Sequence, residues 1–325
     1  MIFQSLIHFL KLIRWQNLVI IIITQYLIRF CIIEPMIYSL GQSAGMIFLL
    51  QMSSFNFFLL VLSTVLIGAA GNVINDYFDL KIDRINKPEK IIVGRFIKRR
   101  VAMGMHIVLN SLGLLIGAYV SIKIGIWKLM LIQVFAIMSL WYYSTHFKHV
   151  VLTGNFIIAL LASIIPLIVG LFEIPLINYR YGNILNEFNA NFNFISYWII
   201  AFSVFAFIFT LAREITKDIA DIKGDEYCGS YTIPIAYGIN TARIISMVLY
   251  FIAFILILFS WFRFLKDFLS LFFIIILILV PLSITIFKTY KAQNRNQFLS
   301  SGNWNKIASV GGILFTLVAR YIILH

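Results

Sequence analysis

Charged residues are scarce in this sequence. Only 12% of the 325 residues are charged and 61% are hydrophobic, whereas a soluble globular domain carries about 25% charged residues. The apolar residues fall in runs that are long enough to cross a bilayer. The scarcity of charge therefore excludes a soluble globular protein and predicts an integral membrane protein.

Cysteine is also scarce, and the histidines lack the spacing of metal ligands. Cys31 lies in an apolar run and Cys228 in a polar segment, so the two cysteines form no metal-type pair. His106, His146 and His149 share no ligand spacing. These absences exclude a thiolate or histidine metal centre.

Acidic residues are half as frequent as basic ones, which leaves a net charge of +13. A basic balance can indicate nucleic acid, but a membrane protein keeps its excess lysine and arginine on the cytoplasmic side in any case. We therefore expect membrane lipids and no nucleic acid as partners.

Nine apolar segments predict an all-α, polytopic membrane protein. The run from Leu18 to Ile33 is too long for a signal-peptide core, so we expect a retained first membrane helix. The predicted spans are roughly 17–37, 54–74, 102–122, 127–143, 153–172, 195–213, 241–262, 267–288 and 306–324. The outer segment 173–194 is rich in asparagine, and we expect it to be irregular.

Most of the 26 lysines and arginines fall at one side of these spans. The positive-inside rule then places the N-terminus in the cytoplasm and the C-terminus outside, which for a bacterial protein means the inner membrane. We expect a single domain over 1–325, in which the helix 17–37 precedes two pseudo-repeated four-helix halves at about 54–172 and 195–324.

Two acidic stretches organise the chain. Asp76–Asp83 and Asp218–Asp225 both read D-x-x-D-x-K-x-D, and they contain six of the seven aspartates. Each stretch follows the cytoplasmic end of a predicted span. A single aspartate at such a position is usually a helix cap or a solvated charge, but repeated spacing on one side of the membrane favours a function.

The spacing within each stretch indicates a hard metal ion. Asp79 and Asp83 are four residues apart, as are Asp221 and Asp225, so each pair projects from one helical face about one turn apart. Asn75 extends the first face. Like-charged carboxylates near a membrane repel one another unless a cation joins them. An all-oxygen ligand set favours Mg²⁺, which commonly bridges carboxylates to phosphates.

Cations near both stretches support a diphosphate ligand, because a phosphate binds Lys and Arg through charge-assisted hydrogen bonds. They are Lys81, Arg84, Lys87, Lys90 and Arg95 after the first stretch, and Arg213, Lys217 and Lys223 beside or within the second. A transporter that uses the twin clusters is an alternative of another class. A transporter site lies near the membrane midplane, whereas these aspartates lie at span ends.

The motifs around the acidic stretches resemble those of the UbiA family of intramembrane prenyltransferases. The first motif runs from Asn75-Asp76-Tyr77-Phe78-Asp79 through Asp83-Arg84-Ile85-Asn86-Lys87-Pro88. Further matches are Tyr143-Ser144 with Lys148, Gly154-Asn155, and Thr232-Ile233-Pro234 with Gly238. The similarity covers almost the whole chain.

The resemblance implies transfer of an isoprenoid group from its diphosphate to an acceptor. It implies Mg²⁺ held by Asn75, Asp76, Asp79, Asp83, Asp218, Asp221 and Asp225, of which Asp76 is either a ligand or a neighbour of the ligands. It implies diphosphate contacts from Arg84, Lys87, Lys148, Asn155, Arg213 and Lys217. Tyr143 would lie near the allylic cation. The reaction would thus depend on Asp79, Asp83, Asp221, Asp225, Tyr143 and Lys148.

The sequence indicates the acceptor of the isoprenoid group less specifically than it indicates the reaction. Arg213-Glu214-Ile215, leading into Lys217-Asp218, is similar to members that prenylate geranylgeranylglyceryl phosphate. Members that prenylate 4-hydroxybenzoate, dihydroxynaphthoate or homogentisate share the metal motifs. We expect a geranylgeranyl donor and the ether-lipid acceptor, with an aromatic acceptor as the alternative.

Overall fold

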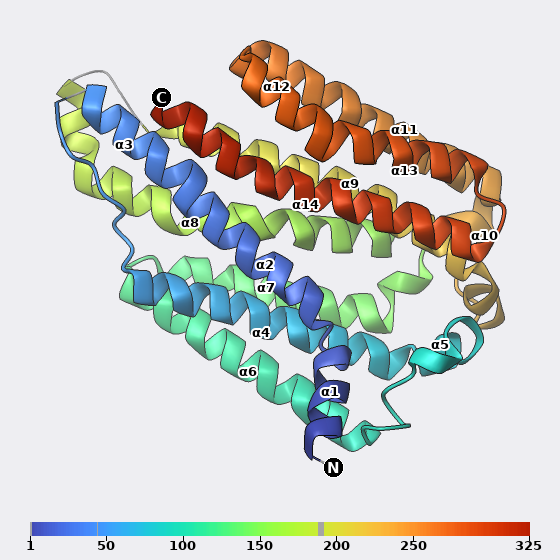
Figure 1. Cartoon of the computed structure of the whole chain (residues 1–325). Coiled ribbons are helices and arrows are strands. Elements are labelled where there is room, and N and C mark those ends of the chain that lie inside the picture. The colour runs from blue at the N-terminus through green and yellow to red at the C-terminus, as the bar shows by residue number, and fades with distance from the viewer. Residues whose placement is uncertain (1, 44, 188–191) are drawn as a thin grey trace. The chain divides into compact units, whose positions relative to one another are not determined.

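The computed structural model describes residues 2–43, 45–187 and 192–325. These residues are almost entirely helical, and among them the only β-type pairing is an isolated bridge between Val93 and Ile97. The predicted all-α class is confirmed (Figure 1).

The chain forms two compact units. Unit one comprises residues 1–22, 52–157 and 221–235, and unit two comprises 23–51, 158–220 and 236–325. Four of the five divisions fall within helices, namely α2, α8, α9 and α10, and the fifth falls between residues 51 and 52, before α4. The two predicted four-helix halves stay a prediction.

Unit one contains α4 (Ser54–Phe78) and α5 (Leu80–Asn86), which carry the first acidic stretch. Its other helices include α1 (Ile2–Leu12), the start of α2 (Trp15–Leu27), α6 (Arg99–Lys123), α7 (Met130–Thr145) and the start of α8 (Thr153–Glu187). It also contains the end of α9 (Asn193–Tyr227), most of α10 (Ile233–Tyr237), and the short 3-10 turns η2 (Pro88–Lys90), η3 (Trp127–Leu129) and η4 (Phe147–His149).

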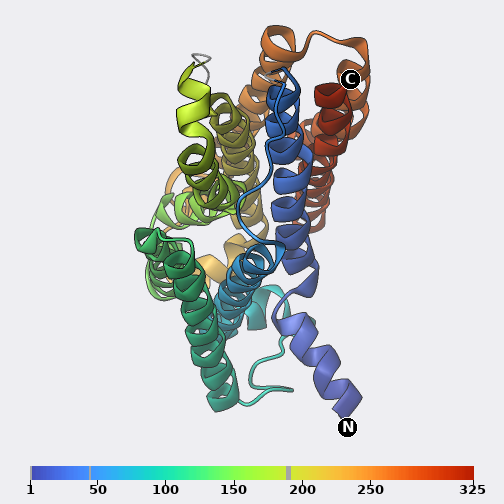
Figure 2. The same cartoon turned by 90° about the vertical axis from the view of Figure 1, so that its left-hand side faces the viewer.

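Helices α4 and α6 run side by side, as both views show (Figures 1 and 2). Glycines in α6 permit this approach. A Cβ added at Gly113 would lie 2.8 Å from the Ile67 side chain, and one at Gly117 would lie 2.8 Å from the Ser63 hydroxyl. Ser63 Oγ also donates a 2.6 Å hydrogen bond to the Gly113 carbonyl. Small residues four apart are a usual means of close helix packing in membranes.

Unit two contains the remaining helices. They are the end of α2 with its π-helical continuation η1 (Ile28–Ile33), α3 (Glu34–Ser43), most of α8 and α9, α11 (Ile239–Ser260), the π-helical segment η5 (Trp261–Leu265), α12 (Phe268–Ile274), η6 (Ile275–Leu279), α13 (Val280–Lys291) and α14 (Arg295–Leu324). The π-helical segments η1 and η6 each precede a proline by two residues, Pro35 and Pro281. A proline ring clashes with the carbonyl four residues before it, and a wider turn at that point relieves the clash.

Unit two also buries an ion pair inside its helices. Arg29 Nε lies 3.3 Å from Glu173 Oε2, and both side chains are almost fully buried. The Gln51 backbone N–H donates to Glu173 Oε1 over 2.7 Å. The pair therefore joins η1, α8 and the segment before α4.

Eight of the nine predicted spans are long and apolar enough to cross a membrane, among the described residues. The exception is α7, where span 127–143 was predicted. It has 16 residues and so extends only about 24 Å, shorter than a typical hydrocarbon core of about 30 Å. The chain is a multi-pass integral membrane protein, and the count of nine is not confirmed.

The prediction that 173–194 is irregular was wrong for its greater part. Helix α8 continues to Glu187 and α9 begins at Asn193, while 188–191 lie outside the described residues. Asparagine lowers helix propensity only weakly, so a few asparagines did not end α8.

Candidate active site

The first acidic stretch spans a break between two helices. Helix α4 ends at Phe78, Asp79 is a non-helical cap residue, and α5 begins at Leu80. The Asp79 N–H still donates to the Asn75 carbonyl over 2.9 Å, and the Asp83 N–H to the Asp79 carbonyl over 2.8 Å. The sequence placed this stretch after the end of a span, and the structure places it across the junction of α4 and α5.

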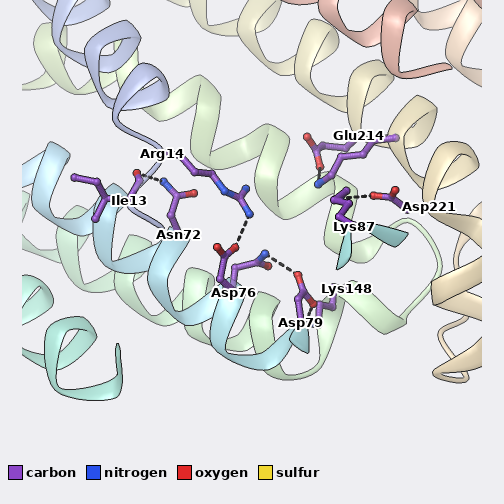
Figure 3. Close-up of polar contacts among 11 residues, drawn as sticks. Ile13, Arg14, Asn72, Asp76, Asp79, Lys87, Lys148, Glu214 and Asp221 are labelled. Atoms are coloured by element: carbon purple, nitrogen blue, oxygen red, sulfur yellow. Dashed lines mark hydrogen bonds and ion pairs between the residues drawn. The ribbon is translucent and has the colours of Figure 1, made fainter. Parts of the chain in front are cut away.

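Asp79 receives hydrogen bonds from two directions. Asn75 Nδ2 donates to Asp79 Oδ2 over 2.7 Å, and Lys148 Nζ is in contact with Asp79 Oδ1 (Figure 3). Lys148 comes from η4, the turn after α7, and only 9% of its side chain is exposed. The structure therefore joins the first acidic stretch to the lysine of the predicted Tyr143–Lys148 motif.

The Asn75 amide also has an oxygen that makes no hydrogen bond. Asn75 Oδ1 is buried and has no partner. A buried acceptor without a donor is costly, which makes this oxygen suited to a cation.

Asp76 and Asp83 differ in their surroundings. Arg14 Nη2, at the junction of α1 and α2, donates to Asp76 Oδ1 over 2.7 Å (Figure 3). Asp83 has no such close cation; burial and the neighbouring Asp79 carboxylate raise the pKa of Asp83 from 3.8 to about 6, although Lys87 opposes the shift. The like charges of the first stretch thus repel one another, as the spacing predicted.

The second acidic stretch lies wholly within α9, not in a loop after it. Asp221 and Asp225 belong to unit one, whereas Asp218 lies one turn earlier in the part of α9 that belongs to unit two. Lys87 Nζ donates to Asp221 Oδ2 over 2.8 Å, and the Asp221 side chain is only 10% exposed (Figure 3). Unit one therefore brings the two acidic stretches together through a lysine from the first motif.

The other predicted diphosphate contacts lie in different surroundings. Arg84 is exposed and Asn155 is buried in unit one. In unit two, Arg213 and Lys217 both bond the buried Glu214 carboxylate, at 3.4 and 3.1 Å. Sequence reasoning missed Glu214 as their partner, although the i,i+3 spacing of Glu214 and Lys217 on one helix was a usable signal.

Among the described residues, no three acidic, histidine or cysteine side chains come together as a metal site. Three carboxylates of unit one, those of Asp76, Asp79 and Asp221, are instead bonded to Arg14, Lys148 and Lys87. The bond between Lys87 and Asp221 joins the two stretches. Whether the seven predicted ligands bind a metal stays a prediction.

The fold and the site define an intramembrane protein with two acidic motifs and interleaved lysines. Residues 39–307 match the UbiA prenyltransferase family. This chain belongs to that family.

Named relatives are similar in sequence. The chain is 33% identical over 217 residues to a digeranylgeranylglyceryl phosphate synthase of Methanothermobacter thermautotrophicus. This match covers 66% of this chain and 68% of the relative. It is 27% identical over 245 residues to the synthase of that name from Methanosphaera stadtmanae, covering 75% and 79%. The match to the digeranylgeranylglyceryl phosphate synthase of Methanobrevibacter smithii covers only 58% of that relative's length.

Solved structures share the fold. One, from a study of digeranylgeranylglyceryl phosphate synthase in membranes, aligns over 98% of this chain and 99% of its own, with a TM-score of 0.62 and 23% identity. A UbiA homolog from Archaeoglobus fulgidus bound to DMAPP and Mg²⁺ aligns over 96% and 99%, with a TM-score of 0.57 and 19% identity. At these identities the likeness supports the fold alone.

Proposed function

We propose that this protein is a Mg²⁺-dependent prenyltransferase that transfers a geranylgeranyl group from its diphosphate to geranylgeranylglyceryl phosphate. The observation that carries the proposal is the pairing of both acidic motifs with lysines in one compact unit, Asp79 with Lys148 and Asp221 with Lys87. Alternating carboxylates and lysines suit a magnesium diphosphate, because the carboxylates bind the metal and the lysines bind phosphate oxygens.

The donor set fits magnesium. The side chains that would hold it present only oxygen atoms to a cation, and one of these, Asn75 Oδ1, is buried without a hydrogen-bond partner. The residues that would hold the ion are Asn75, Asp76, Asp79, Asp83, Asp218, Asp221 and Asp225. A bound magnesium would neutralise the charge that develops on the leaving diphosphate.

Lys148 and Lys87 would act both before and after the diphosphate binds. In the structure Lys148 and Lys87 neutralise carboxylates. When a diphosphate binds, these ammonium groups would donate to its oxygens and hold it. We assign the same role to Arg84, Asn155, Arg213 and Lys217.

The proposed reaction breaks the bond between the allylic carbon and the diphosphate oxygen, and the electron pair leaves with the diphosphate. An acceptor hydroxyl oxygen forms the new carbon–oxygen bond, and its proton passes to water or diphosphate. Tyr143, which precedes Lys148 by five residues, would lie near the allylic cation. The apolar helices would hold the isoprenoid tail.

The acceptor assignment rests on the relatives. Those named above are digeranylgeranylglyceryl phosphate synthases, and the stretch around Arg213-Glu214 is similar to such members. An aromatic acceptor is the alternative. We also propose that the N-terminus and both acidic motifs face the cytoplasm, because most lysines and arginines lie at that end of the spans.

The test uses purified full-length protein in detergent, labelled geranylgeranyl diphosphate and a panel of acceptors. The panel contains geranylgeranylglyceryl phosphate, 4-hydroxybenzoate and dihydroxynaphthoate, with Mg²⁺ or with EDTA. We expect prenylation of the glyceryl phosphate only when Mg²⁺ is present. Prenylation of an aromatic compound alone would overturn the acceptor assignment, and no product from any acceptor would overturn the enzymatic proposal.

A further inference from the structure

Asn86, at the end of α5, joins the first motif region to the backbone of the second. Its Nδ2 donates to the Asp221 carbonyl over 2.9 Å, and its Oδ1 accepts from the Gly224 N–H over 3.1 Å. The side chain is buried and lies within unit one with both partners. Both polar ends of one neutral amide are thus satisfied by α9.

Gly224 leaves room for this amide. A Cβ at Gly224 would lie 2.4 Å from Asn86 Nδ2, 2.7 Å from its Cγ and 2.9 Å from its Oδ1. The three nearest atoms all belong to Asn86, so its amide makes the closest contact. Glycine within a helix is less favourable than alanine, and the Asn86 contact is the physical reason for a glycine here.

A second contact holds the turn that follows α9. His149 Nδ1 lies 2.6 Å from Ser230 Oγ, and the Tyr231 N–H donates to the His149 carbonyl over 2.9 Å. His149 directly follows Lys148, which contacts Asp79. In the turn η4, Lys148 therefore bonds the first motif, and His149 bonds the segment that follows the second motif.

Both contacts leave the carboxylates available. Asn86 bonds backbone atoms of α9, and His149 bonds the hydroxyl of Ser230. Burial and the adjacent Lys148 lower the pKa of His149, which keeps the ring neutral at pH 7. Neither residue therefore competes with a metal ion for a carboxylate or adds charge to the site.

We infer that Asn86 and His149 are positioning residues that hold the second acidic motif against the first before substrate binds. Two clusters of like charge repel. Lys87 and Lys148 offset part of that repulsion in the metal-free protein, and the neutral contacts of Asn86 and His149 hold the motifs together without adding charge. The effect on catalysis rests on the proposed function, whereas the effect on the metal-free protein does not.

The first experiment measures hydrogen–deuterium exchange of full-length protein in detergent with EDTA. We expect Asn86→Ala to speed amide exchange in residues 221–231 about tenfold, which corresponds to losing roughly one buried hydrogen-bond pair. Gly224→Ala should act similarly, because the added methyl group displaces the Asn86 amide. Gly104→Ala in α6, where a Cβ would meet nothing within 4 Å, is the matched control and should leave exchange unchanged.

A double variant tests the contact directly. In an Asn86→Ala background the colliding amide is gone, so Gly224→Ala should add no further increase in exchange. Additive effects of the two substitutions would overturn the role of Asn86, as would unchanged exchange in Asn86→Ala.

The second experiment measures the Mg²⁺ concentration for half-maximal prenyl transfer. Asn86→Ala and His149→Ala should raise it about tenfold with little change in kcat at saturating Mg²⁺, because bound metal can itself draw the motifs together. His149→Asn keeps a polar atom near the position of Nδ1 and should restore much of the wild-type value, whereas His149→Gln should not. Asn303→Ala, at an exposed position of α14, is the control for asparagine removal.

The outcomes separate the two proposals. A wild-type protein that prenylates no acceptor overturns the proposed function, while the exchange data still test the positioning role. Variants that lower only the melting temperature, with wild-type exchange at 221–231 and an unchanged Mg²⁺ requirement, would show that Asn86 and His149 serve stability alone and would overturn the inference.

Discussion

The two acidic motifs have the same residue spacing but different backbones. The first changes helix at Asp79, whose φ and ψ are −77° and 1°, so that its aspartates lie on α4, on the cap and on α5. The second is one uninterrupted stretch of α9. Equal spacing in sequence therefore does not give equal geometry.

The motifs also differ in what holds them. Cations from two other parts of the chain bond the first: Arg14 bonds Asp76, and Lys148 contacts Asp79. The second is bonded by two residues from the end of the first motif, Asn86 and Lys87. The first motif region is thus the organising element of unit one, and the second is placed by it.

We expect the largest effect on activity from the loss of the Asp79 or the Asp221 carboxylate. Asp79→Asn and Asp221→Asn should each lower kcat/KM by on the order of 10²–10³, because each removes a ligand of the magnesium ion that would neutralise the leaving group. EDTA should do the same to the wild type. The assay measures initial rates of prenyl transfer over a range of donor concentrations that extends below KM.

Asp267 provides the control, since it is the one aspartate outside the motifs. It caps α12 by accepting the Ser270 N–H over 2.7 Å, so Asp267→Asn should keep full activity. A strong loss in Asp79→Asn with none in Asp221→Asn would show that only the first motif serves catalysis.

Next in size is the loss of the lysines. Lys148→Gln and Lys87→Gln should raise the KM for donor diphosphate about ten- to hundredfold, since a hydrogen bond to a charged group contributes roughly 1.5–3 kcal/mol. We expect the larger change for Lys148, whose side chain is 9% exposed against 24% for Lys87. Lys128→Gln, at an exposed position after α6, should leave KM unchanged, and a change in acceptor KM alone would contradict the assignment.

A smaller effect concerns pH and metal-free stability. The pKa of Asp83 is about 6 in the folded protein and 3.8 as the ordinary value. A raised pKa means that the folded state binds the proton more tightly, so this group's favourable contribution is full below about pH 4 and is lost as pH rises through 6. In EDTA, Asp83→Asn should therefore raise the melting temperature at pH 7.5 more than at pH 4.5. An equal rise at both pH values would contradict the repulsion between Asp83 and Asp79.

The smallest effect is expected at the edge of the first motif. The side chain of Arg14 is 41% exposed, and an exposed ion pair such as that with Asp76 contributes about 0.2–1 kcal/mol. Arg14→Gln should lower the melting temperature only slightly. A double-mutant cycle with Asp76→Asn measures the pair, and a coupling above about 2 kcal/mol, beyond what exposed pairs give, would mean that Arg14 organises the motif more than its exposure indicates.

The sequence predicted much of the fold because membrane helices follow from local composition. Apolar runs alone located the eight long apolar helices of the described residues and the shorter α7, and the placement of lysine and arginine predicted a topology. The predicted ends of the helices were less accurate. Helix α7 is shorter than a typical membrane span. Helices α8 and α9 extend well past the apolar segments, because polar residues outside the membrane can continue a helix.

Within the site, the residue types were predictable and their partners were not. The motifs identified Asp79, Lys148, Lys87 and Asp221, but nothing in their spacing pairs Lys148 with Asp79 or Lys87 with Asp221. Asn86 stood in the quoted motif without an assigned contact. Its role depends on Gly224, a residue far along the chain, and such a pairing is set by packing.

The sequence by itself determined a polytopic membrane protein with twin acidic motifs of the UbiA family, because hydropathy and motif spacing are local properties of the chain. Only the tertiary structure decided which charges meet, how a break at Asp79 makes the first motif unlike the second, and how a neutral amide at Asn86 fits against Gly224. Those depend on distances between residues that are remote in sequence, and such distances are fixed when helices pack.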